Sequence, residues 1–300
     1  MSTIGRGPGV DPLGLVALPR LMARTAGRRI TRIGLIDGQV QTDHPGLADA
    51  HVEFLAPHEG SETAPDDAAS GHATAVAGIL VARRGSGAPA ICPGATLVVR
   101  PIFPSTSLPC GATAPPAVLA SAIADMADAD ARILNLSLTL TPHTHDVDHA
   151  VQRALDYAAR RGLIVVAAAG NLGTLGGSVI TRHRSVIPVV AYDLQGRPAG
   201  ASNLGPSIGR RGVGATGAGI MSLATDGSLR PFGGTSAAAA LVTGTLSLLW
   251  SEFPQASPAE LMLAVTQSPS QSPSRRTSVV PPLVNAWRAY ELLRAAARYA

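Results

Sequence analysis

The chain has 300 residues and a formal net charge of +4, and all 24 of its Lys and Arg positions are arginine. This length allows one large α/β domain, or two smaller ones, with a substantial core. The basic charge admits acidic partners, but no arginine run is interleaved with aromatic residues, which argues against nucleic-acid binding. No run of about 20 uninterrupted apolar residues is present, which argues against a membrane span.

The first 30 residues carry scattered arginines and no apolar run long enough for a secretory segment. We expect residues 1–30 to form an N-terminal extension. The spacing of the two cysteines, Cys92 and Cys110, does not demand a disulfide. Without a signal segment they are expected to be free thiols in a reducing compartment, so the expected location is the cytoplasm.

Short apolar runs alternate with helical patterns between residues 31 and 192. A stretch of this length is about the size of one domain. The runs are nearly continuous, as expected of parallel strands covered on both faces. They span residues 33–36, 97–102, 132–138, 163–169 and 186–192. Helical spacing predicts helices over residues 116–128 and 146–161, with Asp146 as the cap and Gly162 as the stop. This alternation predicts a doubly wound parallel sheet flanked by helices.

The last third of the chain reads mainly as helix. Residues 237–250 form the longest helix candidate, and they are almost entirely apolar, so this helix is expected to be buried. Ser257-Pro258-Ala259-Glu260 is a capping box that starts another helix. A Ser- and Pro-rich stretch at 267–278 is expected to be a surface linker before a final helix at 284–299. We expect residues 31–300 to form a single domain.

An acid, a base and a nucleophile occur in a meaningful order. Asp37 closes the first apolar run, His72 precedes the apolar helical run that includes residues 76–81, and Ser236 lies in Gly233-Gly234-Thr235-Ser236-Ala237-Ala238. A serine hydroxyl needs a neighbouring base, and a carboxylate can orient that base and stabilise its charged form. The order Asp, His, Ser is that of subtilisin. Each residue alone has a plainer interpretation: a strand-end cap, a solvated helix-start histidine, and a helix cap shared with Thr235.

Asn171, in Ala168-Ala169-Gly170-Asn171, supplies a side-chain amide between base and nucleophile. Its plain interpretation is turn chemistry after Gly170. Its functional interpretation is a donor that binds the oxyanion together with the Ser236 backbone N–H. Other histidines compete for a role: His44, and a trio of His143, His145 and His149. A metal cluster at the trio lacks an accompanying carboxylate or cysteine pattern.

Taken together, these segments resemble the subtilisin-like serine peptidases, or subtilases, over about residues 30 to 290. Ile36-Asp37 with Asp43-His44-Pro45-Gly46-Leu47 is similar to the family's aspartate segment, residues 72–78 to its histidine segment and residues 234–238 to its nucleophile segment. The resemblance implies a sheet of about seven parallel strands with flanking helices. It also implies that substrate lies along Ser137, Leu138 and Thr139, and that Ala168, Ala169 and Gly170 form the floor of the first specificity pocket.

Several positions depart from the family pattern. Gly38 replaces the usual Ser or Thr after the aspartate, Ala73 the Gly after the histidine, and Ala240 the Pro four positions after the nucleophile. Thr139-Leu140 stands where a Gly-Gly pair is usual. Gly46 stands where an Asp ligand for calcium is frequent, so we expect no strong calcium site and no cofactor. The aspartate at position 37 leaves no room for the usual propeptide, which implies a compact intracellular form.

The expected function is that of a serine endopeptidase that removes a leader from one dedicated peptide or enzyme subunit inside the cell. Two alternatives remain open. One is a peptide transamidase or macrocyclase of the same fold, because Ala240 would relieve crowding beside the acyl-enzyme. The other is a catalytically weak pseudoprotease that acts as a binding protein, because several motif positions depart from pattern.

Overall fold

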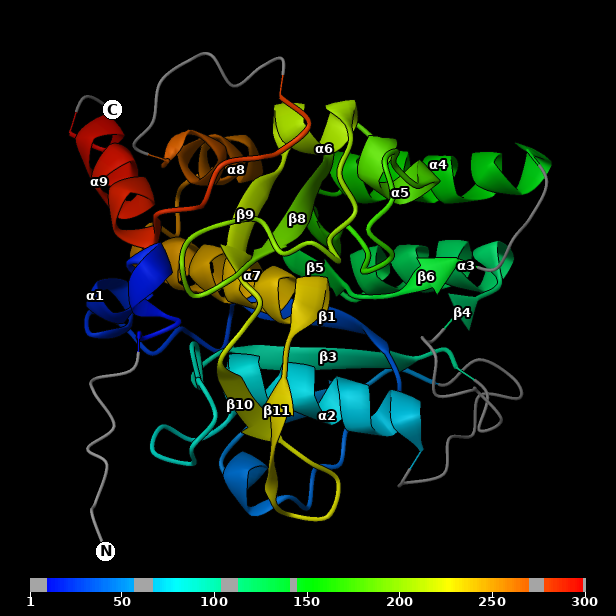
Figure 1. Ribbon diagram of the computed structural model, residues 1–300. Coiled ribbons are helices and arrows are strands. Elements are labelled where there is room, and N and C mark those ends of the chain that lie inside the picture. The colour runs from blue at the N-terminus through cyan, green and yellow to red at the C-terminus, as the bar shows by residue number, and fades with distance from the viewer. Residues whose placement is uncertain (1–9, 57–66, 104–112, 141–144, 270–277, 299–300) are drawn as a thin grey trace, which may run out of the picture.

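A parallel sheet organises the molecule. The computed structural model describes residues 10–56, 67–103, 113–140, 145–269 and 278–298, and the side chains of 139–148 are excluded (Figure 1). The seven strands lie in the order β2 (His51–Phe54), β3 (Thr96–Pro101), β1 (Arg32–Asp37), β5 (Ile133–Leu136), β7 (Ile164–Ala168), β8 (Val186–Tyr192) and β9 (Val213–Thr216). Every neighbouring pair is parallel. The expected α/β fold with a doubly wound parallel sheet is confirmed.

Helices cover both faces of this sheet, and its inner strands are accordingly rich in buried apolar residues. One face packs on α1 (Leu18–Met22), α2 (Ala68–Val81), α7 (Gly234–Glu252), α8 (Pro258–Gln267) and α9 (Ala286–Ala296). The other packs on α3 (Pro116–Asp128), α4 (His145–Arg160) and α5 (Val179–Arg182), with α6 (Pro206–Arg211) beside β8. Successive residues of β1 show the division, because Leu35 belongs to the first core and Ile36 to the second.

Smaller elements complete the described part of the chain. Two short 3₁₀ helices are η1 (Gly14–Val16) and η2 (Pro45–Leu47). An antiparallel hairpin joins β10 (Ile220–Leu223) to β11 (Leu229–Phe232), and a short parallel pair joins β4 (Thr113–Ala114) to β6 (Thr139–Leu140). The hairpin lies against α2, where Ser222 Oγ donates to the carbonyl of Ala75 at 2.6 Å (Figure 1).

The helix α7 runs through the interior and contacts β5, β7, β8 and β9 as well as α2. All of its residues from 235 to 251 are buried. Two of its threonine hydroxyls donate to acceptors inside the protein: Thr245 Oγ1 to the carbonyl of Leu241 at 2.8 Å, and Thr243 Oγ1 to Asn135 Oδ1 at 3.0 Å. Buried polar groups of this kind are tolerated because they are hydrogen-bonded.

The start of α2 differs from the sequence expectation. The helix begins at Ala68, because the Asp67 carboxylate caps it by accepting from the backbone N–H of Ser70 at 2.6 Å. His72 therefore lies in the second turn and not at the helix start. The strand expected over 132–138 is also shorter, since β5 ends at Leu136.

The segment expected to be an extension packs into the core over its described part. Val16, Leu18 and Leu21 are fully buried in the same core as α7. Arg20 lies over the Trp287 ring at 4.0 Å, and Arg24 Nε bonds Glu252 Oε2 at 2.8 Å. The division into residues 1–30 and 31–300 stays a prediction.

Other expectations fall partly outside the described residues. The expected linker at 267–278 starts with the last residue of α8 and the buried Ser268, and residues 270–277 are not described. Cys110 is not described, whereas Cys92 is a buried free thiol whose pKa burial raises to about 12. Within the described part of the chain, no helix is long and apolar enough to cross a membrane.

Candidate active site

The carboxylate of Asp37 lies at the carboxyl end of β1, a central strand flanked by β3 and β5. This is the edge at which open α/β sheets bind their ligands. Asp37 is only 1% exposed, and the backbone N–H of Gly38 donates to its Oδ1 at 2.8 Å. A buried carboxylate needs such donors, and a second one comes from a histidine.

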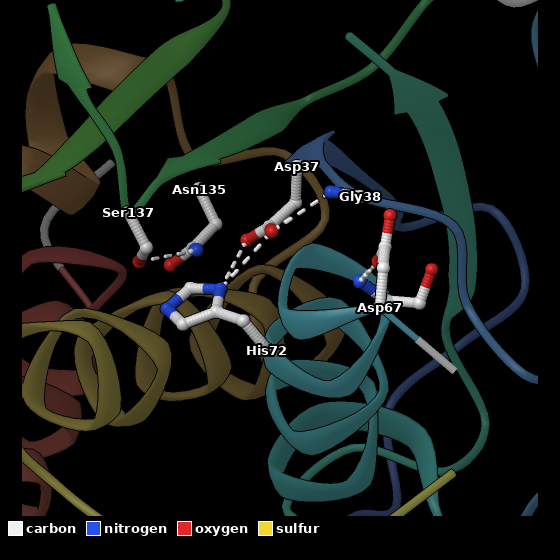
Figure 2. Close-up of polar contacts among 7 residues, drawn as sticks. Asp37, Gly38, Asp67, His72, Asn135 and Ser137 are labelled. Carbon is white, nitrogen blue, oxygen red and sulfur yellow. Dashed lines mark hydrogen bonds and ion pairs between the residues drawn. The ribbon is translucent and has the colours of Figure 1, made fainter. Parts of the chain in front are cut away.

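That histidine is His72, which projects from α2 toward β1 (Figure 2). Its Nδ1 lies 2.8 Å from Asp37 Oδ2 and 3.0 Å from Oδ1. A carboxylate only accepts hydrogen bonds, so Nδ1 carries the hydrogen and Nε2 of the neutral ring is left as a base. Phe232 of β11 meets the ring edge-on, with centroids 5.3 Å apart.

The surroundings of His72 raise its pKa above the ordinary value of 6.5. Burial favours the neutral ring and is the largest influence, and the charge of Arg230 acts in the same direction. The charge of Asp37 and its hydrogen bond favour the imidazolium, and together they prevail. Asp37 therefore stabilises the charged form that a general base acquires during a reaction.

Asn171 is held in one orientation by the residue before Ser236. Its Oδ1 accepts from the backbone N–H of Thr235 at 2.9 Å and from the Thr235 hydroxyl at 3.1 Å. Both neighbours are donors, so Oδ1 faces Thr235 and the NH₂ group is available for another acceptor. The loop fits closely because Gly170 and Gly234 have φ of +105° and +72°; a Cβ on Gly234 would lie 2.9 Å from Asn171 Oδ1.

Thr235 is thus a positioning residue that sequence reasoning treated only as a helix cap. Helix α7 begins at Gly234 with Gly233 as its N-cap and no side-chain cap. The Thr235 hydroxyl instead donates to Asn171 and accepts from the backbone N–H of Gly170 at 3.3 Å. In the sequence, only the position of Thr235 next to Ser236 could have indicated this role. Its bonding partner, Asn171, lies 64 residues away along the chain.

Ser236 lies in the first turn of α7 and is 8% exposed. The N–H groups of a first helical turn lack intrahelical partners, so they are available to an anion. Two contacts tie its segment to the other groups: Thr235 bonds Asn171, and Phe232 touches His72. Among the described residues the Ser236 hydroxyl has no hydrogen-bond partner, and such bonds often tighten only when substrate binds.

The residues expected to bind substrate lie beside this group. Asn135 is fully buried, and its Nδ2 donates to Ser137 Oγ at 3.1 Å (Figure 2). Leu136 pairs with Ile36, so the segment after β5 begins beside Asp37. Leu138 is half-buried, and Thr139 pairs in parallel with Thr113. At Thr139, one backbone edge of the segment expected to bind substrate is therefore already paired with β4.

The expected pocket floor follows β7. Ala168 is its last residue and half-buried, Ala169 is 8% exposed, and Gly170 forms the turn into Asn171. Leu172, the next residue, is 76% exposed. The backbone here is held in place by Asn203, whose Oδ1 accepts from the N–H groups of Leu172 and Thr174.

The competing histidines lie elsewhere. His44 has a structural role: its Nδ1 accepts from the N–H of Gly46 at 2.8 Å, and its Nε2 lies 3.2 Å from the carbonyl of Ser228. His143 and the side chain of His145 fall outside the described residues, and His149 is exposed on α4. The described residues contain no group of three His, Cys, Asp or Glu side chains placed to hold a metal ion.

Gly38 explains one departure from the family pattern and gives a testable expectation. A Cβ at this position would lie 2.4 Å from the carbonyl carbon and oxygen of Ala69, so a side chain would push α2 away from β1. Gly38→Ser should lower the free energy of unfolding by about 1–3 kcal/mol. Urea unfolding measures this, with Gly200→Ser as the control, because a Cβ there meets nothing within 4 Å. Equal stability of the two variants would contradict the close approach.

Comparison with known proteins assigns the family. Residues 29–278 match the model of the Subtilase family. The chain is 33% identical over 231 residues to a thermophilic serine proteinase of Bacillus sp. (strain AK1), covering 76% of this chain and 54% of that protein. It is 28% identical over 231 residues to thermitase of Thermoactinomyces vulgaris, covering 75% of this chain and 77% of that protein. The chain belongs to the subtilase family, a family of serine peptidases.

Solved structures share the fold over nearly their whole length. The protease domain of PatA superposes with a TM-score of 0.80 at 27% identity, covering 90% of this chain and 97% of that one. The prenylagaramide maturation protease PagA gives a TM-score of 0.80 at 25% identity, covering 92% and 98%. The PatG macrocyclase domain, at 18% identity and a TM-score of 0.81, covers 96% of this chain and 98% of that one and shows a common fold alone.

Proposed function

We propose that this chain is a serine endopeptidase that hydrolyses peptide bonds through an acyl-enzyme. Ser236 Oγ attacks the scissile carbonyl as His72 Nε2 takes its proton, and the same proton then passes to the leaving amine. Water, deprotonated by His72, releases the acyl group and restores Ser236. The observation that carries the proposal is the double contact of His72 Nδ1 with the buried Asp37 carboxylate, which leaves Nε2 as the base.

Asn171 and the Ser236 backbone N–H would stabilise the oxyanion. The support for this role is the orientation of the Asn171 amide, whose oxygen accepts from Thr235 while its NH₂ group bonds no other described residue. Beside it, Leu172 presents an uncharged side chain. An apolar or small residue before the scissile bond is therefore proposed over a charged one.

Asn171→Ala should lower kcat about 10²- to 10³-fold with little change in KM, as removal of the oxyanion-hole asparagine does in subtilisin. The reason is that the oxyanion exists only on the path through the transition state. Thr235→Val should lower kcat by a smaller factor, because the hydroxyl bond to Asn171 is lost while the backbone bond at 2.9 Å stays. Steady-state kinetics on one peptide measures both effects.

The control for this pair is Asn285→Ala, which removes the cap of α9 and should leave kcat unchanged. A rise in KM with unchanged kcat in Asn171→Ala would assign this residue to ground-state binding instead.

We further propose that the enzyme performs restricted processing, such as removing a leader from one peptide or enzyme subunit, and that it acts in the cytoplasm. The support is the likeness to the PatA protease domain and to PagA, both of which are maturation proteases by name. A partner polypeptide of this kind would add a strand along Ser137–Thr139 through backbone hydrogen bonds.

The test exposes unfolded casein, and separately the small proteins encoded by neighbouring genes, to the wild type and to Ser236→Ala. Intact-mass analysis then identifies the products. Cleavage of one neighbouring protein at one bond, with casein largely spared, supports restricted processing. Rapid and indiscriminate digestion of casein would refute it. Failure of a fluorophosphonate to label the wild type would favour a binding protein instead.

Transamidation remains a second candidate with weaker support. Ala240 was expected to relieve crowding beside the acyl-enzyme, but it is fully buried one turn further into α7 than Ser236 and opens no space at the surface. The likeness to the PatG macrocyclase domain extends to the fold only. Product masses obtained with added amine separate the two reactions, because an amide product differs from the hydrolysed acid.

A further inference from the structure

The arginine at position 230 lies on the rim of the proposed active site. Side chains two apart on a strand share a face, so Arg230 lies on the face of β11 from which Phe232 touches the His72 ring. The Arg230 Nη1 atom lies 3.1 Å from where a Cβ on Gly71 would stand, and Gly71 immediately precedes His72. The guanidinium is therefore next to the proposed base, in a place that a side chain at position 71 would crowd.

This cation has no carboxylate partner within the described chain. Other arginines have one: Arg24 with Glu252 at 2.8 Å and Arg32 with Glu53 at 2.7 Å. The nearest carboxylate along the hairpin, Asp226, already accepts from the N–H and hydroxyl of Ser228. Arg230 itself is exposed, so its donors face solvent where a substrate would pass.

The charge of Arg230 also opposes the proposed chemistry when no substrate is bound. It lowers the pKa of His72 and so disfavours the imidazolium that forms when Ser236 gives up its proton. A bound carboxylate would neutralise the guanidinium and remove this repulsion. The benefit would be larger in the transition state than in the ground state, so it would raise kcat as well as affinity.

We propose that Arg230 selects substrates with an Asp or Glu shortly after the scissile bond. This inference rests on the proposed peptidase function. The residues before the bond are assigned to Ser137–Thr139 and Ala168–Gly170, which follow β5 and β7. The hairpin lies instead against α2, and the leaving amine departs past the imidazole that protonates it (Figure 1).

The experiment digests a peptide library of natural sequences and identifies both sides of each cleaved bond by mass spectrometry. Asp and Glu should be enriched about three- to fivefold within the first three positions after the bond, the range of an exposed ion pair. Arg230→Gln should abolish the enrichment, and Arg230→Glu should replace it with a preference for Lys or Arg. The matched control is Arg153→Gln, an exposed arginine on α4, which should keep the wild-type profile.

Kinetics on one cleaved peptide and its Glu→Gln counterpart give a second readout. The acidic peptide should have the higher kcat at low salt, and the difference should shrink in 1 M NaCl, where screening acts over about 3 Å. Failure of the wild type to cleave anything in a Ser236-dependent way would refute the peptidase proposal. Ser236-dependent cleavage without acidic preference, or with the preference intact in Arg230→Gln, would refute this inference alone.

Discussion

Replacing Ser236 with alanine should lower the rate of peptide-bond hydrolysis about 10⁶-fold, the size of the effect known for subtilisin. The variant keeps the Asp37–His72 pair and the Asn171 amide, but it lacks the oxygen that forms the acyl-enzyme. The residual rate would come from oxyanion stabilisation and binding. Labelling by a fluorophosphonate should disappear, because that reagent reports the same activated hydroxyl.

The control serine lies on the same helix. Ser251 is 5% exposed, and its hydroxyl donates to the carbonyl of Ser247 at 2.8 Å. Ser251→Ala should retain labelling and hydrolysis. Persistence of either activity in Ser236→Ala would remove Ser236 from the mechanism, and a fluorophosphonate adduct mapped by mass spectrometry would identify the serine that replaces it.

Asp37→Asn should lower kcat about 10⁴-fold, as the equivalent change does in other serine peptidases with this triad. An asparagine amide can donate to His72 Nδ1, which places the ring hydrogen on Nε2 and removes the base. In the wild type, His72 must be neutral to act, and its pKa lies above 6.5. The acidic limb of kcat/KM should therefore lie above pH 6.5 and move to lower pH in the variant, because both influences that raise the pKa come from Asp37.

The free energy of unfolding should depend on the same pKa of His72, but it should fall with rising pH where kcat/KM rises. A folded-state pKa above the unfolded value means that the pair stabilises the protein below about pH 6.5 and that this contribution is lost as pH rises through the folded pKa. Denaturation of the wild type and of Asp37→Asn across this range measures it. Asp193→Asn, a surface carboxylate paired with Arg197, is the control and should leave the acidic limb in place. An unshifted limb in Asp37→Asn would contradict the assigned pair.

The central sheet was predictable because its strands are buried on both faces. Runs such as residues 186–192 are apolar throughout, and β8 has these same bounds. The strand β2 was missed because it is an edge strand whose His51 and Glu53 break the apolar pattern. The strand β9 was missed because Gly214 and Ala215 carry little hydrophobic signal. The capping box at Ser257 was read correctly, since both of its hydrogen bonds are local.

The site was predictable as a set of residue types and not as a geometry. Sequence order and motif context indicated Asp37, His72, Asn171 and Ser236. The sequence does not give the distances between these side chains, so it could not tell which of them are hydrogen-bonded. The start of α2 was misread although Asp67 followed by small residues is a capping signal. The bond from Thr235 to Asn171 and the place of Arg230 depend on how distant segments pack, which no local pattern encodes.

The position of α7 has a consequence for how the protein is made. This helix packs on one face of the sheet and also carries Ser236, so that face is not fully covered until residues 234–252 have left the ribosome. Because domains fold as units during synthesis, nascent chains that end before this helix would hold acid and base without a nucleophile. The proposed peptidase activity would thus arise only after α7 has been synthesised, and shorter nascent chains would have no nucleophile with which to cut their neighbours.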